Sequence, residues 1–328
     1  SVEVTAEDSV STVADKLQDA GLIKYKWFFK LYAGISHADK KIGIGTYTLN
    51  TEMDYRALIL GMHNSSGNLT AETVTVTIPE GYTVMQTIRL LAEKGVNTGE
   101  NLLEAAKTAT YDYSFIDNKS EDISRLEGYL FPDTYEFFTD DSVYNYVNTF
   151  YKEFDAKTSD LWDTINEKGT TMNDVVILAS FIQEEAGMPA EDAKVSACFH
   201  NRLESDDPQW AEHKLESNAS SYIMNDSDNN YLWNSPTAAY YGWPEQGAIP
   251  DDVLAHYDTY RISGLPAGAI TNPGIDAIAA ALNPDQEYLD EGYYFFVTGN
   301  PNGDHPGEYF YAKTADEHHQ NCIIAGWG

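Results

Sequence analysis

Hydrophobic residues near the N-terminus are spaced as on one face of a helix, with polar residues between them. Val10, Ala14 and Leu17 lie about one helical turn apart. Ser9 stands where a helix N-cap is expected, and Gly21 stands where a helix commonly stops. The pattern therefore predicts a short, capped helix at the start of the chain.

The same arrangement returns downstream, so the first third of the chain contains a weak internal repeat. An alternating strand is predicted at 74–78 and a turn at 79–81, and a further strand is predicted at 43–49, between the two copies. Each copy indicates a strand, a capped helix, a glycine stop and a second helix, which together predict a small α/β module. The residues of the second copy that match the first are Thr83, Val84, Ile88, Leu91, Gly95 and Val96.

Two changes in composition divide the chain into predicted modules. Residues 64–68 are the best linker candidate, and a charged stretch at 118–122 precedes a segment rich in apolar residues. Beyond it the patterns are mostly helical, with polar loops between 204 and 260. The expected parts are an α/β module at 1–70, a second module at 71–122 and a larger domain at 123–328.

A helix predicted at 172–186 is apolar on every side, and helices of this kind are buried. It ends in two adjacent carboxylates. Glu184 continues the face of Phe181. Glu185 continues the face of Ile182. At least one of the two carboxylates is therefore expected to lie against apolar neighbours, and periodicity alone does not decide which.

A carboxyl group at the edge of such a helix loses the water that stabilises its charged form. Its pKa should rise, so that it stays protonated near neutral pH and can act as a general acid. The alternative is a pair of glutamates that reaches solvent at the end of the helix and has no catalytic role. The helix pattern by itself favours this second interpretation.

The composition is that of a folded, acidic protein. Hydrophobic residues make up 42% of the 328 residues, and the formal net charge is −32, with a sequence pI near 4.3. This charge opposes binding to nucleic acids, which depends on Lys and Arg at the phosphates. We interpret the excess of acidic residues as a solvated surface.

The cysteines and the apolar runs indicate neither a disulfide framework nor a membrane span. Cys198 and Cys322 are too few for such a framework, and they could pair or remain two free thiols. No apolar run reaches the roughly eighteen residues that a membrane helix needs. The chain opens at Ser1 without a methionine, so we expect that an N-terminal segment has been removed.

Other catalytic signatures are absent or weak. The sequence contains no Gly-x-Ser-x-Gly elbow, phosphate-binding loop or His-Glu-x-x-His pair. Asp226 begins a stretch similar to a calcium loop, but Tyr231 takes its glycine position and Thr237 takes its bidentate glutamate position. His318 and His319 are adjacent, so they lack the spacing to share a metal on one helix face. We expect neither a metal nor a cofactor.

A series of motifs runs through nearly the whole chain. They are 126–135 (Leu-Glu-Gly-Tyr-Leu-Phe-Pro-Asp-Thr-Tyr), 179–185 (Ala-Ser-Phe-Ile-Gln-Glu-Glu), 199–203 (Phe-His-Asn-Arg-Leu), 257–260, 264–274 (Gly-Leu-Pro-Ala-Gly-Ala-Ile-Thr-Asn-Pro-Gly), 280–284 and 294–297. In these segments the sequence resembles the MltG (YceG-like) family of endolytic murein transglycosylases. The catalytic glutamate of that family, the second acid of a Glu-x-Glu pattern, corresponds here to Glu185, and Gln183 replaces the first acid.

The resemblance implies an α+β fold, with small LysM-like βααβ modules N-terminal to a mostly helical catalytic domain of the lytic transglycosylase type that has a few strands. It implies cleavage of the β-1,4 bond between N-acetylmuramic acid and N-acetylglucosamine in peptidoglycan. The 1,6-anhydro ends formed in this way would limit the length of nascent strands. It also implies peptidoglycan synthases as partners and a single N-terminal anchor at the extracytoplasmic face of the bacterial cell membrane.

Polar residues in the matching loops are candidates for contacts to the glycan, and their alternative role is the support of loops and turns. The loop at 215–220 departs from the family pattern, and Tyr309 stands where the family has a histidine. These differences affect the predicted contacts to the substrate and leave Glu185 in place. The candidates for substrate binding are Asn201, Glu216, Ser217, Tyr260 and Asn272.

Two other functions remain open. A hydrolase of the muramidase type would need a second carboxylate to direct water, which Glu127, Glu216 or Glu184 could supply. A peptidoglycan-binding protein without activity is the other possibility, if the altered loop at 215–220 has disabled the site. In both cases the chain would still recognise the same polysaccharide.

Overall fold

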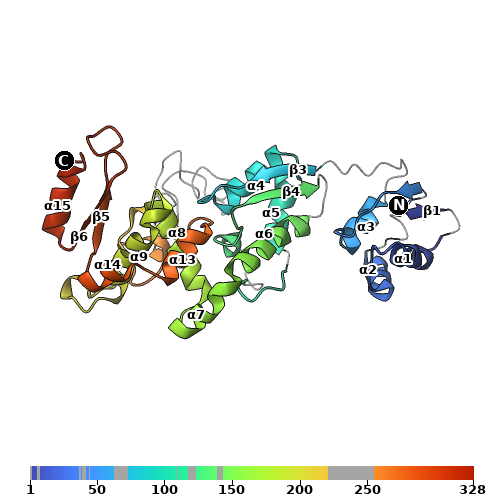
Figure 1. Cartoon of the computed structure of the whole chain (residues 1–328), viewed down its shortest axis with the longest axis horizontal. Helices are drawn as coiled ribbons and strands as arrows, with labels where there is room; N and C mark the ends of the chain where they lie inside the picture. Colours follow the sequence, from blue (N-terminus) through green and yellow to red (C-terminus); the bar gives the residue numbers. More distant parts are fainter. Residues whose placement is uncertain are drawn as a thin grey trace. The chain divides into compact units, whose positions relative to one another are not determined.

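The structure is a computed structural model of the whole chain, and Figure 1 shows the order of its elements. It forms two compact units, one made of residues 1–74 with 136–141 and the other of 75–135 with 142–328. The residues that the structure describes are 2–5, 8–36, 38, 42–43, 45–62, 73–108, 110–116, 123–138, 143–220 and 255–328.

The first unit combines helices with a two-stranded sheet. Its elements are β1 (Val2–Val4), α1 (Val10–Asp19), α2 (Lys26–Ile35), β2 (Gly45–Tyr47) and α3 (Tyr55–Gly61). The strands pair in antiparallel direction, with Val2 opposite Tyr47. Tyr47 is buried together with Val13, Leu17 and Phe29 from the first two helices, so the sheet and the helices share one core.

The helix ends follow from short-range interactions that the sequence predicts. Ser9 caps α1 by accepting a hydrogen bond from a backbone N–H of the first turn, and Gly21 has a φ of 71° just after the helix. Thr83 and Gly95, with a φ of 79°, act in the same way for α4 (Val84–Glu93). The predicted cap at Ser9 and the glycine stops are therefore confirmed.

Residues 73–138 repeat the strand, helix, helix, strand order of the first unit. The elements are β3 (Thr73–Thr77), α4 (Val84–Glu93), α5 (Gly99–Thr108), the short η2 turn (Ile123–Leu126) and β4 (Thr134–Phe138). Strands β3 and β4 pair with each other, and the hydroxyls of Thr77 and Thr134 are 2.9 Å apart. The internal repeat in the sequence thus corresponds to a repeated order of elements.

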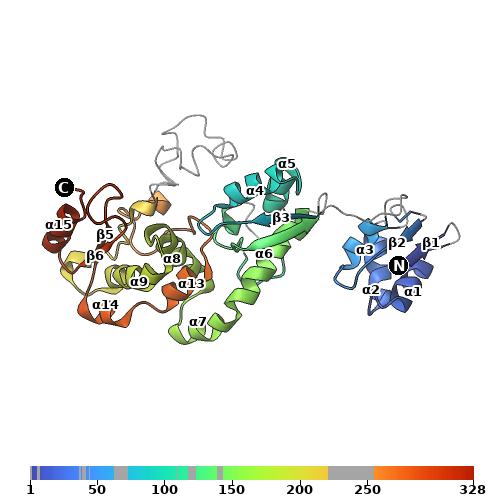
Figure 2. The ribbon, with the colours of Figure 1, turned by 45° about the horizontal axis from the view of Figure 1, so that its top comes forward.

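The rest of the second unit is mostly helical. Its elements are α6 (Val143–Thr158), η3 (Ser159–Leu161), α7 (Trp162–Lys168), α8 (Met172–Glu185), α9 (Pro189–Glu204), η4 (Pro208–Trp210), η5 (Asn218–Ser220), α13 (Ile275–Leu282), α14 (Gln286–Glu291), β5 (Phe295–Thr298), β6 (Tyr309–Ala312) and α15 (Ala315–Ile324). Helix α8 packs against α9 and α13, as Figure 2 shows. Every residue from Val175 to Ile182 is buried, because neighbours cover α8 on all sides.

The mixture of helices and small sheets agrees with the predicted α+β class. The described residues contain three two-stranded sheets, and the last of them, β5 with β6, is antiparallel. The predicted linker at 64–68 and the charged stretch at 118–122 lie outside the described residues, as does the calcium-like stretch from Asp226. The division into the three modules 1–70, 71–122 and 123–328 remains a prediction.

Two further features concern the cysteines and the membrane. Cys198 is buried in α9, Cys322 is partly exposed on α15, and both are free cysteines. The sequence is compatible with a disulfide or with two free thiols, and in the structure both thiols are free. Within the ranges that the structure describes, no helix combines the length and the apolar character needed to cross a bilayer.

Gly128 is a position where the packing around α8 excludes any side chain. Its φ is 92°, and an added Cβ would collide with Val176 and lie 2.9 Å from the Cβ of Ala269. We expect Gly128→Ala to lower the free energy of unfolding by about 2–4 kcal/mol, because overpacking adds to backbone strain. Urea denaturation measures this loss.

Gly169→Ala is the matched control for this substitution. Gly169 also has a positive φ, of 68°, but an added Cβ would meet nothing within 4 Å. The control should therefore lose only about 1 kcal/mol, from backbone strain alone. Equal losses for the two variants would contradict the packing argument.

Candidate active site

Helix α8 brings two carboxylates to its last turn. Thr171 caps the start of the helix, and the helix ends where Ala186 adopts an extended conformation. Glu184 and Glu185 are the last two residues, and both are partly buried. Because successive helical residues are rotated by about 100°, the two side chains reach different neighbours.

The carboxylate of Glu185 is oriented by Ser217, which is itself buried. The hydroxyl of Ser217 donates a hydrogen bond of 2.6 Å to Oε1 of Glu185. The same hydroxyl accepts a hydrogen bond from the backbone N–H of Ala219 at 3.0 Å, so its single hydrogen is directed at the carboxylate. This arrangement holds Oε1 of Glu185 against the loop of Ser217.

The loop that presents Ser217 is held by Thr259. The backbone N–H of Ser217 donates to Oγ1 of Thr259 at 3.0 Å, and that hydroxyl donates to the carbonyl oxygen of Ser217 at 2.9 Å. In the same loop His213 and Glu216 both have a φ of 49°. Residues other than glycine seldom adopt this conformation, so the loop depends on its partners for its shape.

The buried guanidinium of Arg202, on α9, supports this loop from the core. Its Nη1 donates to the carbonyl oxygens of Leu215 at 2.8 Å and Glu216 at 3.0 Å, and its Nε donates to that of Tyr294 at 2.7 Å. Burial lowers the pKa of Arg202, and nearby negative groups, including Glu185, oppose that shift. The rings that surround the guanidinium, with centroids 5.5 to 5.8 Å away, belong to Phe199, Trp210, Phe295 and Phe296.

Arg202 was missed as a site residue in the sequence, although a signal was present. It continues the apolar stripe of Val195, Cys198 and Phe199 along α9, all of which are buried. A charged residue on such a stripe is buried only if its donors find acceptors, so the pattern indicates a paired internal cation. Sequence alone did not show that its acceptors are the carbonyls next to Ser217.

Tyr309, on β6, fixes the end of α8. Its hydroxyl donates to the carbonyl oxygen of Glu185 at 3.0 Å and accepts a hydrogen bond from the backbone N–H of Gly187 at 2.5 Å. Tyr309 therefore holds the backbone beside the candidate acid. No local pattern could predict this contact, because Tyr309 and Glu185 are 124 positions apart.

Glu184 meets a different set of neighbours, which includes Gly81 and Glu127. Gly81 has a φ of 76°, and a Cβ added there would lie 2.8 Å from Oε1 of Glu184. Burial raises the pKa of Glu184 to about 7, and the charge of Glu185 adds to the rise. Burial also raises the pKa of Glu127 well above its usual value. The raised carboxyl pKa predicted for the end of this helix is thus found at Glu184.

Glu127 and Asn272 belong to an internal network. Both carboxylate oxygens of Glu127 accept hydrogen bonds from the backbone N–H of Val84, at 3.0 and 3.2 Å. Nδ2 of Asn272 donates to Oε1 of Glu127 at 3.1 Å and to the carbonyl oxygen of Tyr82 at 2.7 Å. Its Oδ1 accepts from the backbone N–H of Leu130 at 2.8 Å. Asn272 is fully buried, so in this structure its amide joins protein segments.

Two other polar residues of the matching motifs also have internal partners. Nδ2 of Asn201 donates to the carbonyl oxygens of Tyr288 and Tyr293, at 3.1 and 3.0 Å, and ties α9 to the end of α14. Oε1 of Gln183 accepts a hydrogen bond of 2.9 Å from the backbone N–H of Gly274, the N-cap of α13. The side chain of Gln183 thus serves as an acceptor for the backbone.

Of the predicted substrate-binding residues, three are near the candidate acid. Tyr260 is 46% exposed, and its hydroxyl donates to Oδ1 of Asn218 at 3.1 Å. Burial raises the pKa of Tyr260, Arg202 opposes the rise, and the charges of Glu185 and Glu216 add to it. The structure thus groups Ser217, Glu216 and Tyr260 with Glu185, whereas Asn201 and Asn272 make the internal contacts described above.

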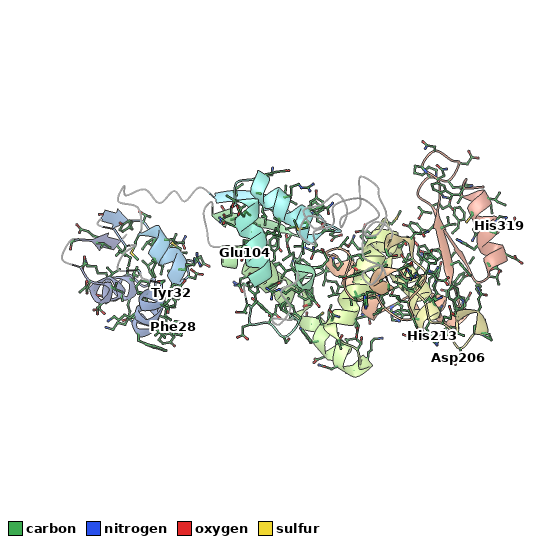
Figure 3. All side chains as sticks on the ribbon, turned by 180° about the vertical axis from the view of Figure 1, so that it is seen from behind. Phe28, Tyr32, Glu104, Asp206, His213 and His319 are labelled. Atoms are coloured by element: carbon green, nitrogen blue, oxygen red, sulfur yellow. The ribbon has the colours of Figure 1, made fainter. Side chains whose placement is uncertain are left out.

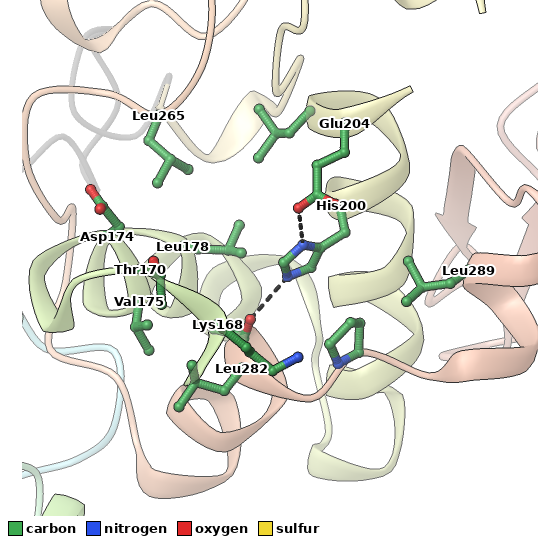
Figure 4. Close-up of a pocket in the computed structure, with 13 residues that line it drawn as sticks. Lys168, Thr170, Asp174, Val175, Leu178, His200, Glu204, Leu265, Leu282 and Leu289 are labelled. Carbon is green, nitrogen blue, oxygen red and sulfur yellow. Dashed lines mark hydrogen bonds and ion pairs between the residues drawn. The ribbon is translucent and has the colours of Figure 1, made fainter. Parts of the chain in front are cut away.

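The described part of the second unit also contains two pockets that Glu185 does not line. One, of about 390 Å³, lies beside α8 and α9 and is shown in Figure 4. In it, Nδ1 of His200 is 2.9 Å from Oε1 of Glu204, and Nε2 is 2.9 Å from the carbonyl oxygen of Ala281. Because a carbonyl oxygen only accepts, Nε2 carries a hydrogen. The other pocket, of about 450 Å³, is lined in part by Glu127.

Of the adjacent histidines of α15, His318 packs against an aromatic ring, whereas His319 is exposed. The ring of His318 stacks on that of Phe295, with centroids 5.2 Å apart, and burial lowers the pKa of His318. Its Nε2 is 3.7 Å from the sulfur of Cys322. Among the residues described, no three His, Cys, Asp or Glu side chains are grouped so that they could hold a metal ion.

Known proteins are similar to this chain over almost its full length. The model of the YceG-like family matches residues 2–323. A protein of Streptococcus pneumoniae serotype 2 named endolytic murein transglycosylase is 27% identical over 341 residues, which cover 98% of this chain. A protein of Bacillus subtilis with the same name is 26% identical, and the match covers 97% of this chain and 82% of that protein. The chain spans 57% of the length of the pneumococcal relative.

A solved structure has the same general fold. The 2.6 Å crystal structure of a yceG-like protein from Listeria monocytogenes superposes with a TM-score of 0.55 and 22% sequence identity. The match covers 98% of each chain. At this identity the likeness concerns the fold, and it extends over both compact units of the chain.

We expect the raised pKa of Glu184 to make the protein less stable as the pH rises from about 4.5 to about 7. The unfolded chain loses this proton near the lower value and the folded chain near the higher one, so the folded state binds more protons in between. Glu184→Gln should reduce the loss of stability by about 1–3 kcal/mol. Urea unfolding of both proteins near pH 5 and near pH 8 measures the difference.

Glu167→Gln is the control for this experiment, because Glu167 is exposed on α7. This control should keep the pH dependence of the wild type. Other buried acids, such as Glu127, contribute in the same direction, so Glu184→Gln should weaken the dependence without abolishing it. The idea fails if wild type and Glu184→Gln lose the same stability over this pH range.

Proposed function

The chain belongs to the YceG-like family, and we propose that it is an endolytic lytic transglycosylase that cleaves peptidoglycan. Its relatives in Streptococcus pneumoniae and Bacillus subtilis carry the name endolytic murein transglycosylase. The observation that carries the proposal is the hydrogen bond from Ser217 to Glu185. It orients one carboxyl group at the end of a buried helix, at the position of the family's catalytic glutamate.

The first chemical step would be a proton transfer from the carboxyl group of Glu185. The proton goes to the oxygen that links C1 of N-acetylmuramic acid to C4 of N-acetylglucosamine. The bond between C1 and this oxygen breaks, and the N-acetylglucosamine side leaves as an alcohol. Glu185 is then a carboxylate, and C1 carries developing positive charge that the carboxylate stabilises.

The second step would return the proton to Glu185. The carboxylate takes the proton of the C6 hydroxyl of the muramic residue, and that oxygen attacks C1 to close a 1,6-anhydro ring. No water is consumed, and the enzyme ends in its starting protonation state. Because the nucleophile belongs to the sugar, a second carboxylate of the kind that hydrolytic glycosidases use is not required.

The residues around Glu185 would bind and position the glycan. The half-exposed ring of Tyr260 gives an apolar face on which a sugar can pack, and its hydroxyl adds a polar edge. Glu216 and Ser217 lie on the same loop, whose backbone is held by Thr259 and Arg202. Asn201 and Asn272 would contribute by keeping the surrounding segments in place.

We also infer a location and partners from the family. The two segments with strand, helix, helix, strand order are proposed as LysM-like modules that bind glycan. The substrate lies outside the cytoplasmic membrane of bacteria, so the chain would act at its extracytoplasmic face and limit the length of nascent strands. A single N-terminal anchor and contacts with peptidoglycan synthases remain predictions from the resemblance.

Products from purified peptidoglycan test the role of Glu185. We expect Glu185→Gln to lower the release of anhydro-ended fragments by about 10²–10⁴-fold, because the amide cannot donate or accept the catalytic proton. Glu184→Gln, the matched neighbour, should keep most of the activity. Mass spectrometry of the digest identifies the ends, since an anhydro end lacks one water relative to a reducing end.

The same digests separate the alternative functions. Reducing ends, lost in Glu216→Gln, would indicate a hydrolase, because Glu216 is the carboxylate on the loop beside Glu185 while Glu127 is bonded internally. Binding of glycan without any cleavage by the wild type would indicate a non-catalytic protein. Loss of activity in Glu184→Gln, with activity kept in Glu185→Gln, would mean that Glu184 is the catalytic acid.

Ser217 should act by orienting the catalytic group. Ser217→Ala removes the hydrogen bond to Oε1 of Glu185, and we expect kcat to fall about 10- to 100-fold with little change in KM. Initial rates over a range of glycan concentrations measure both constants. An unchanged kcat would show that the loop does not position Glu185 during the reaction.

A further inference from the structure

Helix α2 of the first unit has an exposed apolar face that the proposed catalytic role does not use. Trp27, Leu31 and Ile35 follow one another at four-residue spacing and are 62%, 55% and 73% exposed. Phe28 and Tyr25 extend the face and are 47% and 51% exposed. We call these five residues the α2 face.

The α2 face is exposed because the helix uses its opposite side for the core. Phe29 and Ala33 are buried, and the ring of Tyr55 packs on the rings of Phe28 and Phe29. Figure 3 shows the side chains of this unit, with Phe28 and Tyr32 labelled. Soluble proteins seldom leave large apolar side chains contiguous on the surface unless the patch binds something.

The α2 segment is basic within a strongly acidic protein. Residues 24–36 contain Lys24, Lys26 and Lys30 and no acidic residue, whereas the chain as a whole has a formal charge of −32. Asp15 on α1 lies 2.9 Å from Lys26 and 4.0 Å from Lys30. Asp19, at the end of α1, also interacts electrostatically with Lys26. Two carboxylates therefore face the three ammonium groups, and the segment keeps an excess of positive charge.

We propose that the α2 face binds the surface of an anionic phospholipid bilayer. Trp27, Leu31 and Ile35 would enter the boundary of the acyl chains, and the lysines would lie at the phosphate groups. Tryptophan and tyrosine favour this boundary, and lysines beside an apolar helix face are typical of interfacial helices. With ten residues, α2 is too short to span a bilayer, so it lies along the surface.

Charge and composition argue against other occupants of the α2 face. A second copy placed on it symmetrically would bring two sets of lysines together. A glycan would pack on the aromatic rings, but Leu31 and Ile35 offer it no hydrogen bond and no flat ring. An anionic bilayer uses the aromatic, the aliphatic and the basic residues together.

Co-sedimentation of the full chain with vesicles tests the proposal. Vesicles of phosphatidylglycerol and phosphatidylcholine should bind the wild type at least about tenfold more strongly than vesicles of phosphatidylcholine alone, and added salt should weaken the binding. The combined variant Trp27→Ser, Leu31→Ser and Ile35→Ser should lose about tenfold or more of this affinity. Lys24→Gln with Lys30→Gln should lose the preference for the anionic lipid.

Ile323→Ser with Ile324→Ser is the matched control, because these side chains of α15 are 50% and 51% exposed and lie outside the α2 face. The control should bind vesicles like the wild type. The serine variants should keep the thermal unfolding midpoint of the wild type, since the altered side chains are at least half exposed. The readout does not depend on Glu185 or on catalysis.

Two results would overturn the proposal. One is unchanged partitioning of the variant Trp27→Ser, Leu31→Ser and Ile35→Ser onto anionic vesicles. The other is a concentration-dependent dimer in sedimentation that this variant abolishes, because a second copy would then cover the α2 face. Equal loss of vesicle binding in the control at Ile323 and Ile324 would also count against a specific surface.

Discussion

The hydrogen bond between Ser217 and Glu185 joins the end of a buried helix to a loop that could not keep its shape alone. Glu216 sits in the left-handed region, and the loop stays there because Thr259 and Arg202 bond its backbone from two sides. The cation of Arg202 is in turn stabilised in the core by carbonyl oxygens and aromatic rings. The position of one carboxyl group therefore depends on a network that begins deep in the second unit.

Two neighbouring glutamates acquire different environments because a helix turns between them. Glu184 is directed toward Gly81 and the network of Glu127 and Asn272, and burial changes its protonation there. Glu185 is directed toward the loop of Ser217, with Tyr260 beside it. Helix α8 thus separates a carboxyl group that is packed against protein from one that is presented to the loops, and the second is the one that we propose as the catalytic acid.

The molecule is acidic as a whole, but the segment that contains helix α2 is basic. An excess of acidic residues keeps most of the surface solvated, whereas helix α2 combines lysines with large apolar side chains. The α2 face and the carboxyl group of Glu185 belong to different compact units of the chain. The proposed contact with a lipid surface and the proposed chemistry on a glycan therefore depend on different residues.

The sequence by itself determined the local structure. The cap at Ser9, the stop at Gly21 and the all-apolar helix before Glu184 and Glu185 depend on residues within a turn or two of one another, and the structure has them where they were predicted. The motifs also identified the family.

The tertiary structure decided the rest of the candidate site. Periodicity could not choose between Glu184 and Glu185, because the choice depends on which distant segment each one meets. Ser217 and Tyr309 reach Glu185 from 32 and 124 positions away, and Asn272 turns inward to bond a loop near residue 82. Contacts of this kind arise only when the whole chain packs, because no short stretch of sequence contains both partners.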